Sequence, residues 1–367
     1  MKQKGKNNLE KIFIAIIVFS MWVPESFAEN QVPENIKKYN YYVNLAELSI
    51  IDSVYQKAVL YYDSAFMKKD YAFAVDKYNA ALCHVFMENY EQAYSLLKEI
   101  LQKGYSISNL KNKAFLDKFF LSQWGKGLID YSKDIVFTFN EDLRKTLDSL
   151  FYMDQLFRKN REFGDPYDFF EDTINRIDDS NRVALEAIID KYGFPGEEII
   201  GLSESSLIQQ PYSIILRHLQ QISTGRRRGE VTNVSPLVID AYHSGRMPAH
   251  EASDLLELAY RDFGSFSASM IRFIYIPPGD NPFQIPEEEK AKKDWSFINL
   301  KEEESETINK VRLEFGLETI EDLRKKLVFR LDNDTFDFRK IRGGKNILTT
   351  LDKEQYDHVK KNLIPVR

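Results

Sequence analysis

The sequence contains no proline between Pro33 and Pro166, and aliphatic and aromatic residues recur along this stretch at helical spacing. Because proline ends or kinks a helix, so long a stretch without one favours one helix after another. The C-terminal third adds a proline-rich and partly strand-like segment, "IYIPPGDNPFQIP". We therefore predict a mainly α-helical protein with at most a minor β element in the C-terminal third.

One part of the helical stretch, Tyr78 to Tyr105, resembles a tetratricopeptide unit. Small residues on such a unit let two antiparallel helices approach, while large residues fill the space between units. The usual tryptophan and the closing proline are missing. Because one clear unit is too short for a free-standing solenoid, we expect this region, residues 29–135, to dock on the part of the chain after it. The matching positions are Tyr78, Ala81, Tyr90, Ala93, Leu97 and Ile100.

The first 28 residues have the pattern of a secretory signal peptide. Lysines precede the apolar run Ile12 to Val23, and Ser26 and Ala28 are small residues at the spacing of a cleavage site. The run of 12 residues is shorter than the roughly 20 that a membrane-spanning helix needs. We therefore expect an exported protein, periplasmic or extracellular, with no membrane span after cleavage. Its single cysteine, Cys83, can form no internal disulfide and has the surroundings of a helix core.

The charge balance argues against a nucleic-acid partner. Fifty basic and 56 acidic residues give a formal net charge of -6, whereas a nucleic-acid-binding face needs a broad basic stripe. The one dense basic run, Arg226 to Arg228, lies between glycines, which is typical of a solvated loop. The sequence has no glycine-rich phosphate loop, nucleophile elbow or metal-ligand spacing, and we read His243 and His250 as two exposed histidines. We therefore expect no cofactor and no metal.

Three successive predicted helices carry polar residues within their apolar stripes, as a rotation of about 100° per residue shows. Burying an unpaired carboxylate costs several kcal/mol, so we expect these polar groups to meet one another or to line a cleft. The groups are Asp154 and Arg158 on the helix predicted for 141–163, Asp178 and Asn181 on 171–192, and His218 on 203–222, where Pro211 predicts a kink.

Two interpretations of these polar residues stay open. In the first, Asp154 pairs with Arg158, His218 is a satisfied core histidine, and the network fixes how the helices pack. In the second, the carboxylates and His218 converge on a pocket. There His218 performs acid–base chemistry with Asp154 or Asp178, or these residues hold a divalent metal, although their spacing matches no metal motif. The binding residues of that pocket would be Gln155, Arg158 and Asn181.

Two further segments carry predictions about local structure. In "GFPGEEIIG", Gly193 is expected to end a helix, Pro195 to prevent its continuation, and Gly201 to ease entry into the next helix. In the tail, two helices separated by Gly316 are followed by "VFRLDNDTFDFRK", residues 328–340, which suggests a short hairpin.

Several of these motifs together resemble a bacterial domain family of unknown function that is found in many exported proteins. The family pattern runs Asp-Gln-x-x-Arg, Asp-x-x-Asn, Gly-Trp-Pro before a Val-Gly, and a histidine in a Gln-His-Ala helix. Here Phe194 replaces the tryptophan, and Arg217 and Leu219 flank the histidine. Because the family has no established activity, the resemblance implies only a shared fold and a shared polar cluster. The matching positions are Asp154, Gln155, Arg158, Asp178, Asn181, Gly193, Pro195, Gly201 and His218.

The sequence therefore predicts tetratricopeptide-like hairpins, a helical family domain at 141–280, and a C-terminal helical extension at 281–367. We expect a binding or assembly module that uses the repeat-like region for a protein or peptide partner. The alternative is a hydrolase-like acid–base enzyme that uses His218 with Asp154 or Asp178. Whether the protein is an enzyme stays open, because no motif for a nucleophile or a metal supports that alternative.

Overall fold

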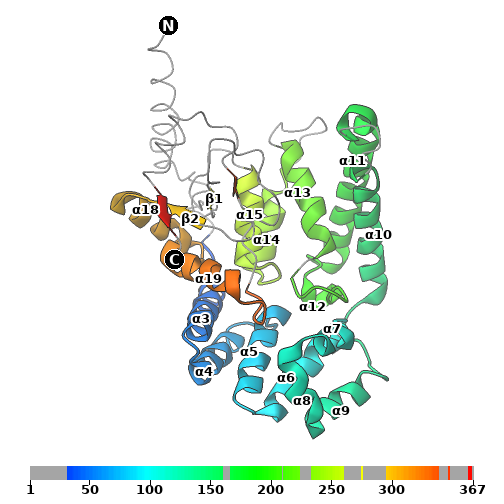
Figure 1. Ribbon diagram of the computed structural model, residues 1–367. Helices are drawn as coiled ribbons and strands as arrows, with labels where there is room; N and C mark the ends of the chain where they lie inside the picture. The colour runs from blue at the N-terminus through cyan, green and yellow to red at the C-terminus, as the bar shows by residue number, and fades with distance from the viewer. Residues whose placement is uncertain are drawn as a thin grey trace. The chain divides into compact units, whose positions relative to one another are not determined.

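The computed structural model shows a mainly helical chain, which confirms the predicted fold class (Figure 1). Contacts within the chain define two compact units, one of residues 32–261 and 333–339, the other of residues 1–31, 262–332 and 340–367. None of the described helices is long and apolar enough to cross a membrane. The predicted signal peptide lies outside the described residues, which are 31–159, 166–208, 210–223, 233–259, 274–275, 295–338, 346–347 and 363–365.

The larger unit begins with helical hairpins, in which each of the first four helices packs against the next or the previous one. The predicted tetratricopeptide-like unit corresponds to the second hairpin. Of its six packing positions, five are buried, and the half-buried Tyr90 lies edge-on to Phe119. The spacing of small and large residues therefore predicted the packing face correctly. The four helices are α3 (Glu34–Ile51), α4 (Tyr55–Phe66), α5 (Ala74–Phe86) and α6 (Tyr90–Gln102).

Short helices come next, and then the helices that carry the polar residues. Helix α10 begins after Asn140, whose side-chain Oδ1 accepts a hydrogen bond from the backbone N–H of Leu143 at 3.0 Å. Helices α10, α11 and α13 pack on one another (Figure 1). The elements are α7 (Ile107–Lys111), the 3-10 helix η2 (Ala114–Leu116), α8 (Asp117–Leu121), α9 (Gln123–Tyr131), α10 (Glu141–Arg158), α11 (Pro166–Tyr192), α12 (Glu197–Ile200), α13 (Pro211–Ser223), α14 (Ser235–His243) and α15 (Ala249–Ala259).

The prediction of a kinked helix over 203–222 is wrong, because α13 begins at Pro211. Proline has no backbone N–H, and the first helical position is the one where that donor has no partner within the helix. The described residues before it are irregular, with one isolated β-bridge between Ser203 and Ser206. Gly201 therefore ends α12 and leads into this irregular segment, not into a helix as predicted.

The predicted hairpin at residues 328–340 is also wrong. Helix α19 (Ile320–Asp332) continues through its first five residues, and the described residues after the helix are irregular. Asn79 of α5 holds this segment through two hydrogen bonds, from its Nδ2 to the carbonyl of Asp337 at 3.1 Å and to its Oδ1 from the Asp337 N–H at 3.0 Å. Phe336 packs on Phe86. Phe336 thus packs on a helix instead of on a partner strand, and Phe338 is buried next to Phe336.

The smaller unit contains the minor β element predicted for the C-terminal third. Its short strands pair in the order β3-β1-β2-β4, with β1 parallel to β3 and the other two pairs antiparallel. Helices α18 and α19 are separated at Gly316, whose φ of 81° is the left-handed conformation that glycine favours. The elements are β1 (Ile274–Tyr275), β2 (Trp295–Ile298), α18 (Glu302–Glu314), α19 as above, β3 (Asn346–Ile347) and β4 (Leu363–Pro365).

Candidate functional site

The structure brings polar side chains of three helices into contact, and we call those that contact one another the polar cluster. Asp154 of α10 lies at its centre. Its Oδ1 lies 2.9 Å from Nδ1 of His218 on α13 and 2.9 Å from Nη1 of Arg158. Its Oδ2 accepts a hydrogen bond from Nε2 of Gln155 at 2.7 Å. The members of the polar cluster are Asp154, Gln155, Arg158, Asp178 and His218.

The guanidinium of Arg158 joins the two carboxylates of the cluster. Its Nη2 lies 2.5 Å and 2.7 Å from the two carboxylate oxygens of Asp178 on α11. Its Nη1 also donates to the backbone carbonyl of Asp154 at 2.6 Å. Asn181 is placed differently, because its Nδ2 donates over 3.5 Å to the backbone carbonyl of Leu150 and so ties α11 to α10. The Arg158 guanidinium thus forms ion pairs with two buried carboxylates.

The two carboxyl groups respond to these surroundings in opposite directions. Burial acts to raise the pKa of Asp154, but the hydrogen bond and charge of His218, together with Arg158, outweigh it and lower that pKa. For Asp178, burial is the largest effect and raises the pKa, although Arg158 opposes it. Asp154 is therefore the carboxylate that the cluster holds ionised most strongly.

The polar cluster is nearly sealed from water. The exposed fractions of its side chains are 0% for Asp154, 1% for Asp178, 7% for Arg158 and 10% for His218. One ligand atom from each of Asp154, Asp178 and His218 lies within 4.8 Å of the others, a spacing that could hold a metal ion. However, the guanidinium of Arg158 already supplies a positive charge to both carboxylates, so a metal would have to displace it.

Replacing Asp154 with asparagine is expected to lower the free energy of unfolding by about 1–2 kcal/mol at pH 6, because a charged hydrogen-bond acceptor is lost. The folded-state pKa of Asp154 lies below its usual value of 3.8. The stability that its charge contributes is therefore fully present above pH 3.8 and is lost as the pH falls through the folded-state pKa. Urea unfolding of the wild type and Asp154→Asn from pH 6 to pH 2.5 measures the difference, which should shrink on the acid side. A difference that stays constant or grows there would contradict this assignment.

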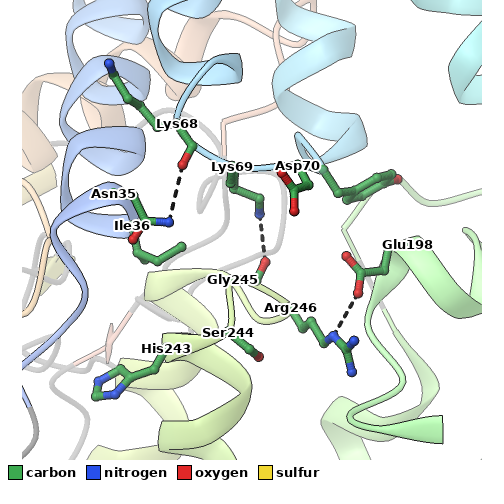
Figure 2. Close-up of a pocket in the computed structure, with 11 residues that line it drawn as sticks. Asn35, Ile36, Lys68, Lys69, Asp70, Glu198, His243, Ser244, Gly245 and Arg246 are labelled. Atoms are coloured by element: carbon green, nitrogen blue, oxygen red, sulfur yellow. Dashed lines mark hydrogen bonds and ion pairs between the residues drawn. The ribbon is translucent and has the colours of Figure 1, made fainter.

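A second site, which we call the junction pocket, lies beside the start of α3, where two connecting segments meet helix α12 (Figure 2). One segment joins α4 to α5 and the other joins α14 to α15. The pocket has a volume of about 290 Å³. It combines residues of the hairpins with residues of the later helices, so it depends on how these two parts of the larger unit pack. Its polar lining includes Asn35, Lys69, Asp70, Glu198, Ser244 and Arg246.

Hydrogen bonds tie the connection between α4 and α5 to helix α12 and to the connection between α14 and α15. The buried Glu197 of α12 accepts hydrogen bonds at its Oε1 from the hydroxyl of Tyr71, at 2.7 Å, and from the backbone N–H of Ala74, at 2.6 Å. Lys69 donates from its Nζ to the carbonyl of Gly245 at 2.7 Å, as Figure 2 shows. The walls of the pocket are therefore fixed by side chains and do not depend on a ligand.

The two glycines of the "GFPG" turn lie against Arg246, which lines the junction pocket, and a side chain on either glycine would collide with it. Gly193 ends α11 with a φ of 73°, which confirms its predicted role as a helix stop. A Cβ on Gly193 would lie 2.1 Å from Nη1 of Arg246, and one on Gly196 would lie 2.7 Å from the Arg246 carbonyl oxygen. Arg246 in turn pairs with Glu198, from its Nε to Oε1 at 2.8 Å. The turn thus positions a charged pair at the pocket.

Gly193→Ala is expected to lower the free energy of unfolding by about 1–2 kcal/mol, because alanine is strained at positive φ and its Cβ would displace Arg246. Gly127→Ala is the matched control. Gly127 lies within α9, and an added Cβ would meet only a Tyr94 ring atom, at 3.8 Å. That control should be neutral or stabilising, because alanine is the better helix former. Equal urea midpoints for Gly193→Ala and the wild type would refute the close packing of this turn.

The remaining residues noted in the sequence have simpler environments. Cys83 is buried, and burial raises the pKa of its thiol, which agrees with a helix-core residue. His243 and His250 are half-buried, so the prediction of two exposed histidines is wrong. His243 lies beside the junction pocket, and burial lowers its pKa. The basic run Arg226 to Arg228 lies outside the described residues.

Comparisons with protein-family models, with curated proteins and with solved structures found no match for this chain. The resemblance to the exported domain family therefore stays a prediction. The fold and the two sites together describe a mainly helical protein with helical hairpins, a buried polar cluster and a polar junction pocket.

Proposed function

We propose that this is a non-enzymatic binding protein that holds a small polar ligand in the junction pocket. The observation that carries the proposal is the contrast between the two sites. The charged groups of the polar cluster pair with one another and are almost completely buried. The junction pocket has polar walls, and its residue Asp70 is exposed, with no hydrogen bond or ion pair to any other residue in the described part of the chain. Polar groups that converge on a pocket are what ligand recognition requires.

In this proposal the polar cluster has a structural role. Removing one partner from a buried ion pair leaves an uncompensated charge, so a fully paired cluster permits one arrangement of α10, α11 and α13 and penalises others. Those helices continue into α12 and α14, which supply Glu198 and the connection that carries Arg246. The cluster would thus hold in place helix α12 and the connection after α14, which both line the junction pocket.

A thermal-shift screen of the full chain tests the proposal with a library of amines, amino acids, sugars, carboxylates and phosphates. Ser244 is an exposed residue of the pocket lining, so Ser244→Trp should fill the pocket. Ser205→Trp, at another exposed serine in a connecting segment, is the matched control. We expect at least one compound to raise Tm by about 3 °C or more in the wild type and the control, but not in Ser244→Trp.

Either of two results would overturn the proposal. One is a screen in which no compound raises the Tm of the wild-type protein. The other is a shift of equal size in Ser244→Trp, which would place the ligand elsewhere. Circular dichroism of both tryptophan variants must match the wild type, so that a lost shift reports a filled pocket and not a misfolded chain.

A second candidate function is acid–base catalysis, and the 2.9 Å contact between Asp154 and His218 favours it. In acid–base enzymes a carboxylate at Nδ1 orients the imidazole and leaves Nε2 for the substrate. A catalytic imidazole must be reached by solutes. Modification with diethyl pyrocarbonate, mapped by mass spectrometry, should then label His218 at least as fast as the half-buried His243. Protection of His218 relative to His243 would favour the structural role.

A further inference from the structure

The geometry points to a more specific ligand for the junction pocket, a small molecule or peptide that presents a primary ammonium group to Asp70. This inference rests on the proposed binding function and names the ligand class. It is carried by the charges that line the pocket, because all of them except one are directed away from the pocket or engaged with neighbouring groups.

Two cations of the pocket lining, Lys69 and Arg246, already have partners. The ammonium of Lys69 donates to the carbonyl of Gly245 at 2.7 Å and lies 3.3 Å from the ring centroid of Phe73. The guanidinium of Arg246 pairs with Glu198 at 2.8 Å, and Figure 2 shows this pair at one side of the pocket. Both cations therefore already have partners with which an anionic ligand would have to compete.

The third cation, Lys68, does not face the pocket. Its Nζ lies 5.7 Å from the ring centroid of Tyr42, and Figure 2 shows its side chain extending away from Gly245 and Arg246. Asp70 is different, because its carboxylate points toward the space above these two residues in Figure 2. Among the charged groups that the structure describes in the pocket lining, the Asp70 carboxylate is therefore the one that faces the pocket without a hydrogen bond or ion pair to another described residue.

An ammonium group matches this arrangement better than an anion does. It carries three N–H donors and no acceptor, and the carboxylate of Asp70 together with the side-chain oxygens of Ser244 and Asn35 provides acceptors in the lining. A phosphate or carboxylate placed beside Asp70 would be repelled by its negative charge. The volume of about 290 Å³ is near the lower end of ligand pockets, which suits a ligand of the size of an amino acid, a dipeptide or a short diamine.

Isothermal titration of the full chain tests this inference with two amine probes. Cadaverine is compared with N,N′-diacetylcadaverine and glycylglycinamide with its N-acetylated form, so that neither acetylated probe carries an ammonium group. The diamine and the peptide present the same ammonium group, so the pair distinguishes a small-molecule amine from a peptide amino terminus. We expect at least one probe to bind and its acetylated form to bind about tenfold more weakly or worse. Asp70→Asn should weaken the same probe by about tenfold to a hundredfold, which corresponds to the loss of a charged hydrogen bond.

Asp52→Asn is the matched control, because Asp52 is an exposed aspartate at the far end of α3 from the pocket and should leave affinity unchanged. Equal binding of the acetylated probes, or unchanged affinity in Asp70→Asn, would overturn the inference. If no amine binds while another library compound binds in a manner that Ser244→Trp abolishes, the ammonium inference fails and the binding function stands. If no compound binds at all, both fail.

Discussion

Replacing Arg158 with alanine is expected to lower the free energy of unfolding by about 3–5 kcal/mol, the usual cost of leaving a buried charge without its partner. Arg158 contacts both Asp154 and Asp178, whose side chains are almost fully buried. Without the guanidinium, one of these carboxyl groups must take up a proton or the helices must separate to admit water. Either change weakens the packing of α10 against α11.

Urea unfolding at pH 7 measures this loss, and Arg176→Ala is the matched control. Arg176 is an exposed arginine on α11, and its Nε donates to the carbonyl of Asp172 within the same helix. An exposed arginine of this kind is expected to change stability by less than about 0.5 kcal/mol. A similarly small loss for Arg158→Ala would mean that the two carboxylates are not held as described.

Replacing Glu197 with alanine is expected to cost about 2–3 kcal/mol, because two groups lose the charged oxygen that accepts their hydrogen bonds. One of them is the backbone N–H of Ala74, the first residue of α5, and the other is the Tyr71 hydroxyl. A carboxylate at this position also favours the helix N-terminus electrostatically. The segment between α4 and α5, which carries Lys69 and Asp70, would lose its attachment to α12.

Two variants make this prediction specific. Glu197→Gln keeps an oxygen acceptor without the charge, so it should lose about half as much stability as Glu197→Ala. Glu204 is an exposed glutamate, and its backbone carbonyl, which alanine keeps, accepts the hydrogen bonds that the structure shows for it. Glu204→Ala should therefore leave the free energy of unfolding nearly unchanged. Equal stability of Glu197→Ala and Glu204→Ala would show that Glu197 does not join the two segments.

The polar cluster could be anticipated from the sequence because helical periodicity is a local property. Each turn of α10, α11 and α13 fixes which residues face inward, so Asp154, Asp178 and His218 could be placed on buried faces from their spacing alone. The expectation that these side chains contact one another followed from the free-energy cost of burying an unpaired charge. The partner of each atom was not predictable, since Arg158 could have paired along its own helix or, as the structure shows, also with Asp178.

The junction pocket could not be anticipated, because its residues come from connections that meet only through packing of distant helices. Asp70, Glu198 and Arg246 are far apart in the sequence, and each one alone is an ordinary charged surface residue. The available signal was the glycines, since Gly193 and Gly245 both adopt positive φ beside the pocket. Such glycines indicate a tight turn but not which side chain the turn accommodates.

The two errors in secondary structure have related causes. The alternation of Phe336 and Phe338 is the pattern of a strand, but an extended segment lying on helices buries alternate side chains in the same way. Pro211 is compatible with either a kink or a helix start, and the choice depends on whether the residues before it have partners for a helical turn. Both decisions rest on contacts that lie outside the local sequence.

A crystal structure of the full chain, grown with the compound that gives the largest thermal shift, would show whether the junction pocket binds that compound. We predict electron density for that compound in the junction pocket, with a nitrogen atom within hydrogen-bond distance of the Asp70 carboxylate. Density in the pocket without that contact would keep the binding function but contradict the ammonium assignment. Density for the compound at His218, with the junction pocket empty, would contradict the proposed binding function of the pocket.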